Sequence, residues 1–343
     1  MAGTAHPAPH RGGPRRRRPA GPARPAAARR WQEASAICWS LGDRRGEAAA
    51  LDLLGEASWL ATRYREALAY SCEAADAYRG TGDRHGVATA SSHSAIRWHL
   101  GRPADAIARL RGALSLYRDV GDRRGEAKTL NNLGQMQLQS GYHRDALASY
   151  RGSLTIFAEI GGPQNEAILY HNIGRVYDYK GSSEEALEAY RRALAIYRAI
   201  GDLANEADVL NAMGLTYQRA DLLDEALLYH QKAQTIAADI GNLFDQVVAL
   251  RGIADVHRRR GRYREALGDY DVALWHARQI SDPYEEAKIL EGIAETRAAA
   301  RQPDTARIAL RQALDIYEAL GVPEAEAARI RLDTMDPNDT RRP

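Results

Sequence analysis

Apolar residues recur at helical spacing along most of this chain, with polar residues between them. The segment from 170 to 197 shows the pattern clearly. Its large apolar positions are Tyr170, Ile173, Tyr177, Leu187, Tyr190, Leu194 and Tyr197. Spacings of three, four and seven residues place such side chains on one face of an α-helix. The sequence contains no convincing alternation of the strand type, so the pattern predicts an all-α protein.

The helical pattern is divided by a short turn motif that recurs along the chain. Successive copies lie 40 residues apart, with a single step of 39. The central residues of the motif are Gly42, Gly82, Gly121, Gly161, Gly201, Gly241, Ser281 and Gly321. Glycine adopts the left-handed conformation that ends a helix, and the Asp or Asn that usually follows it can cap the next helix. Eight such turns bound seven repeated units.

Small residues occupy fixed positions inside each unit. An alanine recurs as Ala67, Ala106, Ala146, Ala186, Ala226, Ala266 and Ala306. A second small residue follows seven positions later, as Ala74, Ala113, Ser153, Ala193, Ala233, Ala273 and Ala313. A third precedes the alanine by twelve, as Gly55, Ser94, Gly134, Gly174, Gly214, Ala254 and Ala294. We expect small side chains at these positions to let two helices approach closely.

Each unit also has an internal break, which indicates a pair of helices. The break falls at Thr62, Gly101, Gly141, Gly181, Asp221, Gly261 and Arg301. Each unit is therefore predicted to be a helix A, a tight turn, a helix B and the recurrent turn described above.

The residues Tyr170, Ile173-Gly174, Tyr177, Gly181, Ala186, Tyr190 and Ala193 resemble the tetratricopeptide repeat signature. The 40-residue period resembles the longer-helix form found in kinesin light chains. It also resembles the C-terminal arrays of actinobacterial regulators of the Streptomyces antibiotic regulatory protein type, which carry an NB-ARC-like ATPase. The resemblance covers about residues 31–334 and implies a right-handed α-α superhelix of seven repeats with terminal capping helices. Ser94, Ala254 and Ala294 replace the signature glycine, and Arg97, His257 and Arg297 replace its tyrosine.

The ends of the chain differ in composition from the repeats. Residues 1–30 hold eight Arg and six of the 13 Pro but no Asp, Glu or Lys, so we expect a disordered tail. Residues 31–334 are expected to form the solenoid, beginning with a lone helix B at Trp31, and residues 335–343 to be disordered. Two interpretations of the tail remain: a genuine flexible segment, or an unrelated leader on the detached array of a longer regulator.

Charge and cysteine content narrow the class of protein. The formal net charge is +2, and removing the eight tail arginines leaves −6 for the rest of the chain, so the basic character belongs to the tail. Cys38 and Cys72 form neither a disulfide framework nor a zinc motif, which favours a cytoplasmic protein. Apolar runs are too short for a membrane span, so we expect no membrane association.

Sequence motifs for catalysis are missing from the chain. It contains no GxxxxGK[ST] phosphate loop, no HExxH and no GxSxG sequence. The adjacent carboxylates Glu184-Glu185 and Glu285-Glu286 point in different directions on a helix, which favours surface and capping roles. We therefore expect neither an enzyme nor a bound cofactor or metal.

The resemblance implies that helices A line a concave groove that binds a partner. The candidate residues are Asn131, Gln135, His171, Arg175, Asn211, Arg219, Arg251 and Arg258. Amides suit the backbone of an extended peptide, and arginines suit carboxylates. We expect Arg175, Arg219, Arg251 and Arg258 to form a basic strip that binds an acidic protein segment, although Asp178 and Asp255 lie within it. Charge reversal at Arg175 and Arg251 is expected to abolish binding and leave the melting temperature nearly unchanged.

The best functional interpretation is a protein-interaction scaffold that serves as the sensing or autoinhibitory array of a bacterial transcriptional regulator. The alternative is a DNA-associated regulator that binds through Arg15–Arg18 and the rest of the tail. Salt would weaken such binding steeply, and removing residues 1–30 would abolish it. The identity of the partner and the oligomeric state are not encoded in any motif of the chain.

Overall fold

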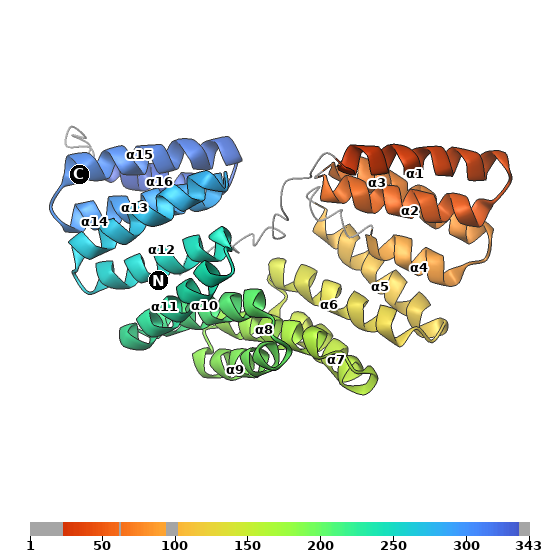
Figure 1. Ribbon diagram of the computed structural model, residues 1–343, viewed down its shortest axis with the longest axis horizontal. Helices are drawn as coiled ribbons and strands as arrows, with labels where there is room; N and C mark the ends of the chain where they lie inside the picture. Colours follow the sequence, from red (N-terminus) through yellow and green to blue (C-terminus); the bar gives the residue numbers. More distant parts are fainter. Residues whose placement is uncertain (1–22, 62, 94–101, 336–343) are drawn as a thin grey trace, which may run out of the picture. The chain divides into compact units, whose positions relative to one another are not determined.

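The computed structural model describes residues 23–61, 63–93 and 102–335, which form α-helices joined by short turns (Figure 1). The helices A are α2 (Arg44–Leu60), α4 (Arg84–His93), α6 (Arg123–Gln139), α8 (Pro163–Tyr179), α10 (Leu203–Arg219), α12 (Leu243–Arg259), α14 (Pro283–Ala299) and α16 (Glu324–Thr334). The helices B are α1 (Ala23–Ser40), α3 (Tyr64–Gly80), α5 (Pro103–Asp119), α7 (His143–Ile160), α9 (Ser183–Ile200), α11 (Leu223–Asp239), α13 (Tyr263–Gln279) and α15 (Pro303–Leu320). No β-strand occurs among these described residues.

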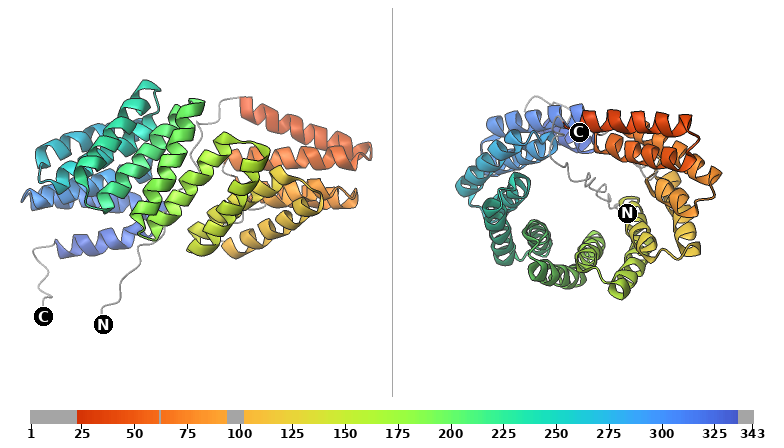
Figure 2. Two further views of the ribbon diagram at one scale, coloured as in Figure 1. Left: turned by 90° about the horizontal axis from the view of Figure 1, so that it is seen from below. Right: turned by 45° about the vertical axis from the view of Figure 1, so that its right-hand side comes forward.

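The chain divides into two compact units between Lys180 and Gly181. The first unit contains α1 to α8 and the second contains α9 to α16. Within each unit, each helix packs against the next one in the sequence (Figure 2). Successive helices A also contact each other. In the first unit α2 contacts α4, and α6 contacts α8. In the second unit α12 contacts both α10 and α14. Side chains of neighbouring repeats can therefore meet along the helices A.

The predicted turns are confirmed by their backbone conformation. All of the recurrent turn glycines have a positive φ, between 64° and 74°. Three residues that are not glycine take the same conformation, namely Asp221 at 61°, Ser281 at 52° and Arg301 at 59°. A residue with a Cβ is strained in this backbone conformation. Glycine would adopt it more easily at these three positions. The predicted breaks at Thr62 and Gly101 lie outside the described residues.

The expected caps are present at the starts of helices A. The side chains of Asp43, Asp83 and Asp122 each accept a hydrogen bond of 2.9 Å from the backbone amide three residues later. The side chain of Asn242 accepts the equivalent bond from Asp245 at 3.3 Å. These bonds satisfy amides that have no partner within the helix.

The small repeat residues lie where helices touch. The seven alanines from Ala67 to Ala306 and the seven small residues from Ala74 to Ala313 are all 0% exposed. A Cβ added at Gly134 would lie 2.8 Å from the Tyr150 ring, and one at Gly214 would lie 2.7 Å from the His230 ring. The close approach of helices A and B therefore depends on small residues, as predicted. Ser94 lies outside the described residues.

The first helix of the array is longer than the sequence predicts. Helix α1 begins at Ala23 and not at Trp31. The alanines at 26–28 favour a helix, and a proline at position 25 is tolerated because it falls in the first turn. The predicted capping helix is present as α16. Residues 1–22 and 336–343 lie outside the described part, so disorder of the tail and of the C-terminus stays a prediction. None of the described helices is both long and apolar enough to cross a membrane.

Candidate partner-binding surface

The first unit holds four of the predicted partner-binding residues on two adjacent helices A. Asn131 and Gln135 lie on α6, His171 and Arg175 lie on α8, and all four are half-buried. The side-chain amide of Asn172 donates a 3.1 Å hydrogen bond to Oδ1 of Asn131 and so links the two helices. This part of the surface combines amides with basic groups.

Arg175 also lies close enough to the core to affect a buried tyrosine. Burial raises the pKa of Tyr150, and the positive charge of Arg175 partly opposes that rise. Within the described residues, the Tyr150 hydroxyl has no hydrogen-bond partner. The guanidinium of Arg175 therefore supplies positive charge to a region that holds an unpaired phenol oxygen.

In the second unit, Asn211 is part of the core rather than of an open surface. It is only 3% exposed. Its Nδ2 donates to the backbone carbonyl of Asp245 at 3.4 Å, and its Oδ1 lies 3.2 Å from Nδ1 of the buried His230. Gln218 makes a similar link, since its Nε2 donates to the carbonyl of Gly252 at 2.8 Å. Both amides tie α10 to α12, whereas Arg219 at the end of α10 is exposed.

Arg251 is almost buried and is bound to two carboxylates. Its side chain is 14% exposed. Its guanidinium lies 2.9 Å from Glu285 on α14 and 3.7 Å from Asp255 on its own helix. Burial lowers the pKa of Arg251, but the charges of Glu285 and Asp255 outweigh that effect and raise its pKa above the usual value. Arg251 is therefore a structural cation.

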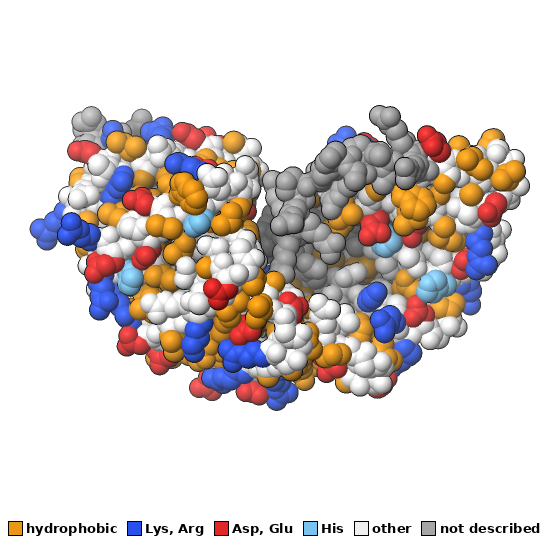
Figure 3. Space-filling model, in the orientation of Figure 1, with side chains coloured by type: hydrophobic (Ala, Val, Ile, Leu, Met, Phe, Trp, Pro, Cys, Tyr) orange, Lys and Arg blue, Asp and Glu red, His pale blue; other side chains and the backbone are white. Residues whose placement is uncertain are grey.

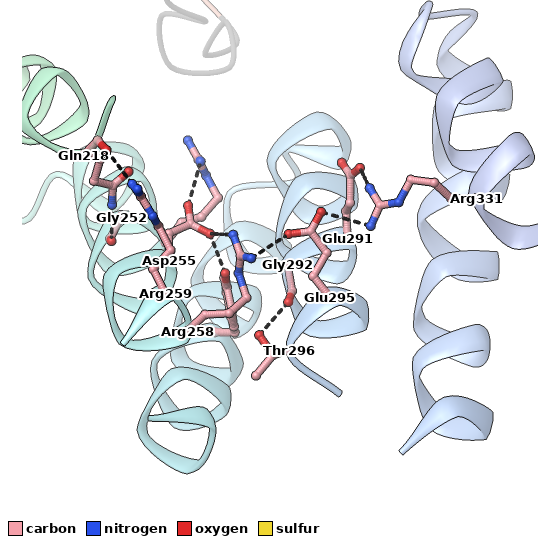
Figure 4. A network of polar contacts seen from close by, with 12 residues as sticks. Gln218, Gly252, Asp255, Arg258, Arg259, Glu291, Gly292, Glu295, Thr296 and Arg331 are labelled. Carbon is pink, nitrogen blue, oxygen red and sulfur yellow. Dashed lines mark hydrogen bonds and ion pairs between the residues drawn. The ribbon is translucent and has the colours of Figure 1, made fainter. Parts of the chain in front are cut away.

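Arg258 continues the same network toward the C-terminus (Figure 4). Its guanidinium lies between Asp255, at 3.6 Å, and Glu295 of α14, at 3.1 Å. Arg331 of α16 then contacts both Glu295, at 2.9 Å, and Glu291, at 2.5 Å. Charges of alternating sign thus join α12, α14 and α16.

The sequence predicts a strip of free basic charge, but Arg251 and Arg258 are paired with carboxylates and do not supply it. Both lie on the expected helix, but carboxylates of α14 neutralise them. Figure 3 likewise shows acidic and basic side chains interspersed over the visible face of each unit. Reversing the charge of Arg251 would place a carboxylate beside Glu285 and Asp255. We therefore expect charge reversal at Arg251 to lower the melting temperature, in place of the unchanged value expected from the sequence.

Sequence reasoning missed the carboxylates that bind these arginines. Helical spacing identifies only Asp255, because it lies four residues from Arg251 on the same helix. The other partners lie on the next helix A. Their sequence separations are 34 residues for Arg251 and Glu285, 37 for Arg258 and Glu295, and 40 for Glu291 and Arg331. A search for opposite charges at separations near one repeat would have found them.

The described residues contain no group of three or more His, Cys, Asp or Glu side chains able to hold a metal ion. The geometry instead shows paired helices whose A members carry linked polar side chains. This arrangement defines a helical repeat protein with a scaffold-type binding surface.

A tetratricopeptide repeat family model matches residues 87–159, 141–199, 205–274 and 245–319. Together these segments span more than half of the chain, so the chain belongs to the tetratricopeptide repeat family. The predicted fold class, an all-α tetratricopeptide solenoid, is confirmed. A search of curated protein sequences found no match.

Several solved structures share this fold. A signal transduction ATPase with numerous domains and a tetratricopeptide repeat sensor, from Pyrococcus horikoshii, has a TM-score of 0.63 and 16% identity, over 92% of this chain and 50% of that one. The apo form of RapI has a TM-score of 0.63 and 14% identity, over 80% of this chain and 99% of that one. BtubC from P. vanneervenii has a TM-score of 0.51 and 17% identity, over 71% of this chain and 94% of that one. At these identities the likeness shows the fold alone.

Proposed function

We propose that the faces of helices A bind an extended segment of a partner protein. The observation that carries this proposal is the side-by-side packing of successive helices A within each unit. That packing aligns half-buried amide and charged side chains across several repeats. A bound chain could use these groups for hydrogen bonds along its length. Tetratricopeptide arrays generally act through protein–protein contacts and not through catalysis.

We place the acidic part of the partner against the first unit. There, His171 and Arg175 of α8 lie with the amides of Asn131 and Gln135 on α6, and Asp178 is the acidic residue on the same face. An Asp or Glu of the partner would gain charge-assisted bonds from such a group. In the second unit a partner would have to compete with Glu285 and Glu295 for Arg251 and Arg258. A segment of mixed charge fits that unit better.

The regulatory role belongs to the same proposal. We propose that the array is the sensing or autoinhibitory part of a bacterial, cytoplasmic transcriptional regulator. The Pyrococcus protein supports this idea, because it joins a tetratricopeptide sensor to a signal transduction ATPase and its likeness spans 92% of this chain. Binding of a protein segment to the array would then control a domain attached to it.

A displayed-peptide library selected on the full chain tests the binding surface. We expect the enriched peptides to carry acidic residues and to bind Arg175→Glu at least tenfold more weakly than the unmodified chain. Arg144→Glu on α7 is a matched control, because Arg144 is exposed on a helix B of the same unit. Peptides that bind both variants equally well would place recognition outside the faces of helices A.

A further inference from the structure

A recurrent ion pair fixes several of the junctions between a helix B and the next helix A. An arginine three residues before the turn residue binds a glutamate five residues after it. The pairs are Arg118–Glu126 at 2.7 Å, Arg198–Glu206 at 2.7 Å and Arg278–Glu286 at 2.8 Å. We call this arrangement the junction clamp.

At the junction around Gly121 the clamp has two arginines. Glu126 accepts one hydrogen bond from Arg118 and another from Arg123, both at 2.7 Å. The Glu126 residue is 6% exposed. Its burial raises the pKa of Glu126, but the bonds from the two arginines outweigh the burial and lower its pKa below the usual value. This junction shows that two arginines in this register hold a carboxylate in its ionised form.

The junction around Gly82 has both arginines but no carboxylate between them. Arg79 stands at the register of Arg118, and Arg84 stands at the register of Arg123. The residue at the register of Glu126 is Val87. The protein thus repeats the cationic half of the clamp and replaces its anionic half with an apolar side chain.

A pocket of about 540 Å³ lies at this position, between α3, α4 and α5. Arg79, Arg84 and Arg109 supply its positive charge, and Val87 and Leu116 supply apolar wall. Gly112 contributes no side chain, and a Cβ added there would meet nothing within 4 Å. The pocket, which we call the Val87 pocket, is therefore open beside its arginines.

The present partners of these arginines are surface carboxylates. Arg79 pairs with Asp76, whose side chain is 74% exposed. Arg84 pairs with Asp119, at 2.5 Å, and that side chain is 46% exposed. Exposed ion pairs are worth about 0–1 kcal/mol, so an incoming carboxylate can replace them at little cost. Arg79 and Arg84 are therefore available to a carboxylate that enters the Val87 pocket.

We propose that the Val87 pocket binds an Asp or Glu side chain of a partner polypeptide, in the place that Glu126 takes at the next junction. The apolar wall of Val87 and Leu116 receives an aliphatic neighbour of that acidic residue. This wall favours a polypeptide over a small inorganic anion, which could use only the arginines. The proposal rests on α3, α4 and α5 and is independent of the faces of helices A discussed above.

The probe for this site is the blocked tripeptide N-acetyl-Leu-Glu-Leu-amide, titrated into the full chain. NMR signals of the side-chain Nε–H groups of Arg79 and Arg84 report its binding. We expect both signals to shift with the glutamate peptide and not with the matching glutamine peptide. A third titration uses inorganic phosphate in place of a peptide. If phosphate moves both signals as much as the glutamate peptide does, the site takes an adventitious ion only, and the proposal is overturned.

Three variants test the register argument. Val87→Glu restores the missing carboxylate, so we expect a higher melting temperature and at least a tenfold loss of affinity for the glutamate peptide. Val87→Gln has a similar shape without the charge and is expected to gain no stability. Arg79→Gln with Arg84→Gln changes only exposed side chains and should also abolish binding. This variant lacks the two reporter groups, so its binding is followed by the backbone amide signal of Val87. Full affinity in either the Val87→Glu chain or the double arginine variant would overturn the proposal.

Discussion

Nδ1 of His230 lies 3.2 Å from Oδ1 of Asn211, in a part of the second unit where both side chains are buried. His230 stands at the repeat position that Tyr150, Tyr190 and Tyr270 occupy in other repeats. Within the described residues, its Nε2 is buried without a hydrogen-bond partner. The histidine is thus held between helices as a neutral ring.

This burial predicts a loss of stability in mild acid. Burial, together with the charge of Arg251, lowers the pKa of His230 from 6.5 to about 3. The folded state keeps the ring neutral below pH 6.5, whereas the unfolded chain binds a proton there. The contribution of the neutral His230 ring to the free energy of unfolding is therefore complete above about pH 6.5. It decreases by a few kcal/mol in total as the pH falls toward 3. Urea unfolding at pH 7, 6, 5 and 4.5 measures it.

The variant His230→Leu separates this effect from other titrations. Leucine occupies the same repeat position in Leu110 and Leu310, both 0% exposed. We expect a lower stability at pH 7, because Oδ1 of Asn211 loses its partner, but a shallower decrease between pH 6.5 and 4.5. Equal pH slopes in the variant and the unmodified chain would show that His230 is not the group responsible.

The ion pairs of Arg251 predict a second stability effect. Arg251→Met removes the cation and leaves the carboxylates of Glu285 and Asp255, which are 10% and 21% exposed, without it. Breaking a buried pair in this way costs about 3–5 kcal/mol. Arg264→Met on the exposed surface of α13 is the control and should change the free energy of unfolding by less than about 0.5 kcal/mol. Similar results for the two variants would contradict the structural role of Arg251.

The aromatic residue of the repeat predicts a third effect. Tyr190 is 0% exposed, so Tyr190→Ala should destabilise the protein by about 3–5 kcal/mol. Tyr142→Ala is the matched control, because Tyr142 is 57% exposed and should matter little. Chemical denaturation of both variants compares them. A small effect at Tyr190 would mean that the repeat position does not form the core.

The turn at Arg301 predicts a gain in stability. Its φ is 59°, so a residue with a Cβ is strained there. Arg301→Gly should raise the free energy of unfolding by about 1 kcal/mol, since glycine removes the strain. Arg301→Ala keeps a Cβ and should bring no such gain. The idea fails if thermal unfolding shows Arg301→Ala to be as stable as Arg301→Gly.

The sequence predicts the fold well because the fold depends on local and repeated signals. Small residues such as Ala186 recur in register, and each recurrence marks one contact between helices. The candidate surface is predicted less well. The position of Arg251 on helix A follows from the repeat. Its pairing with Glu285, which neutralises its charge toward a partner, involves another repeat. Helical periodicity cannot show a contact between residues 34 positions apart.

Starts of helices are predicted unevenly for a related reason. Asp122 marks the start of α6 because its side chain caps the helix. Helix α1 begins among alanines and arginines at Ala23, where no capping residue or apolar period marks the boundary. The sequence pattern therefore predicts that this helix starts at the first large apolar residue, Trp31.

The contacts between successive helices A also bear on how such an array can lengthen. Suppose that residues 243–282 were duplicated and the copy inserted after Asp282. The copy of Asp245 would then take the place of Glu285 beside Arg251, and the copy of Asp255 would take the place of Glu295 beside Arg258. Each arginine would still meet a carboxylate. Gene duplication could add this repeat without leaving a buried charge unpaired, so the length of the array is free to vary while its ion pairs persist.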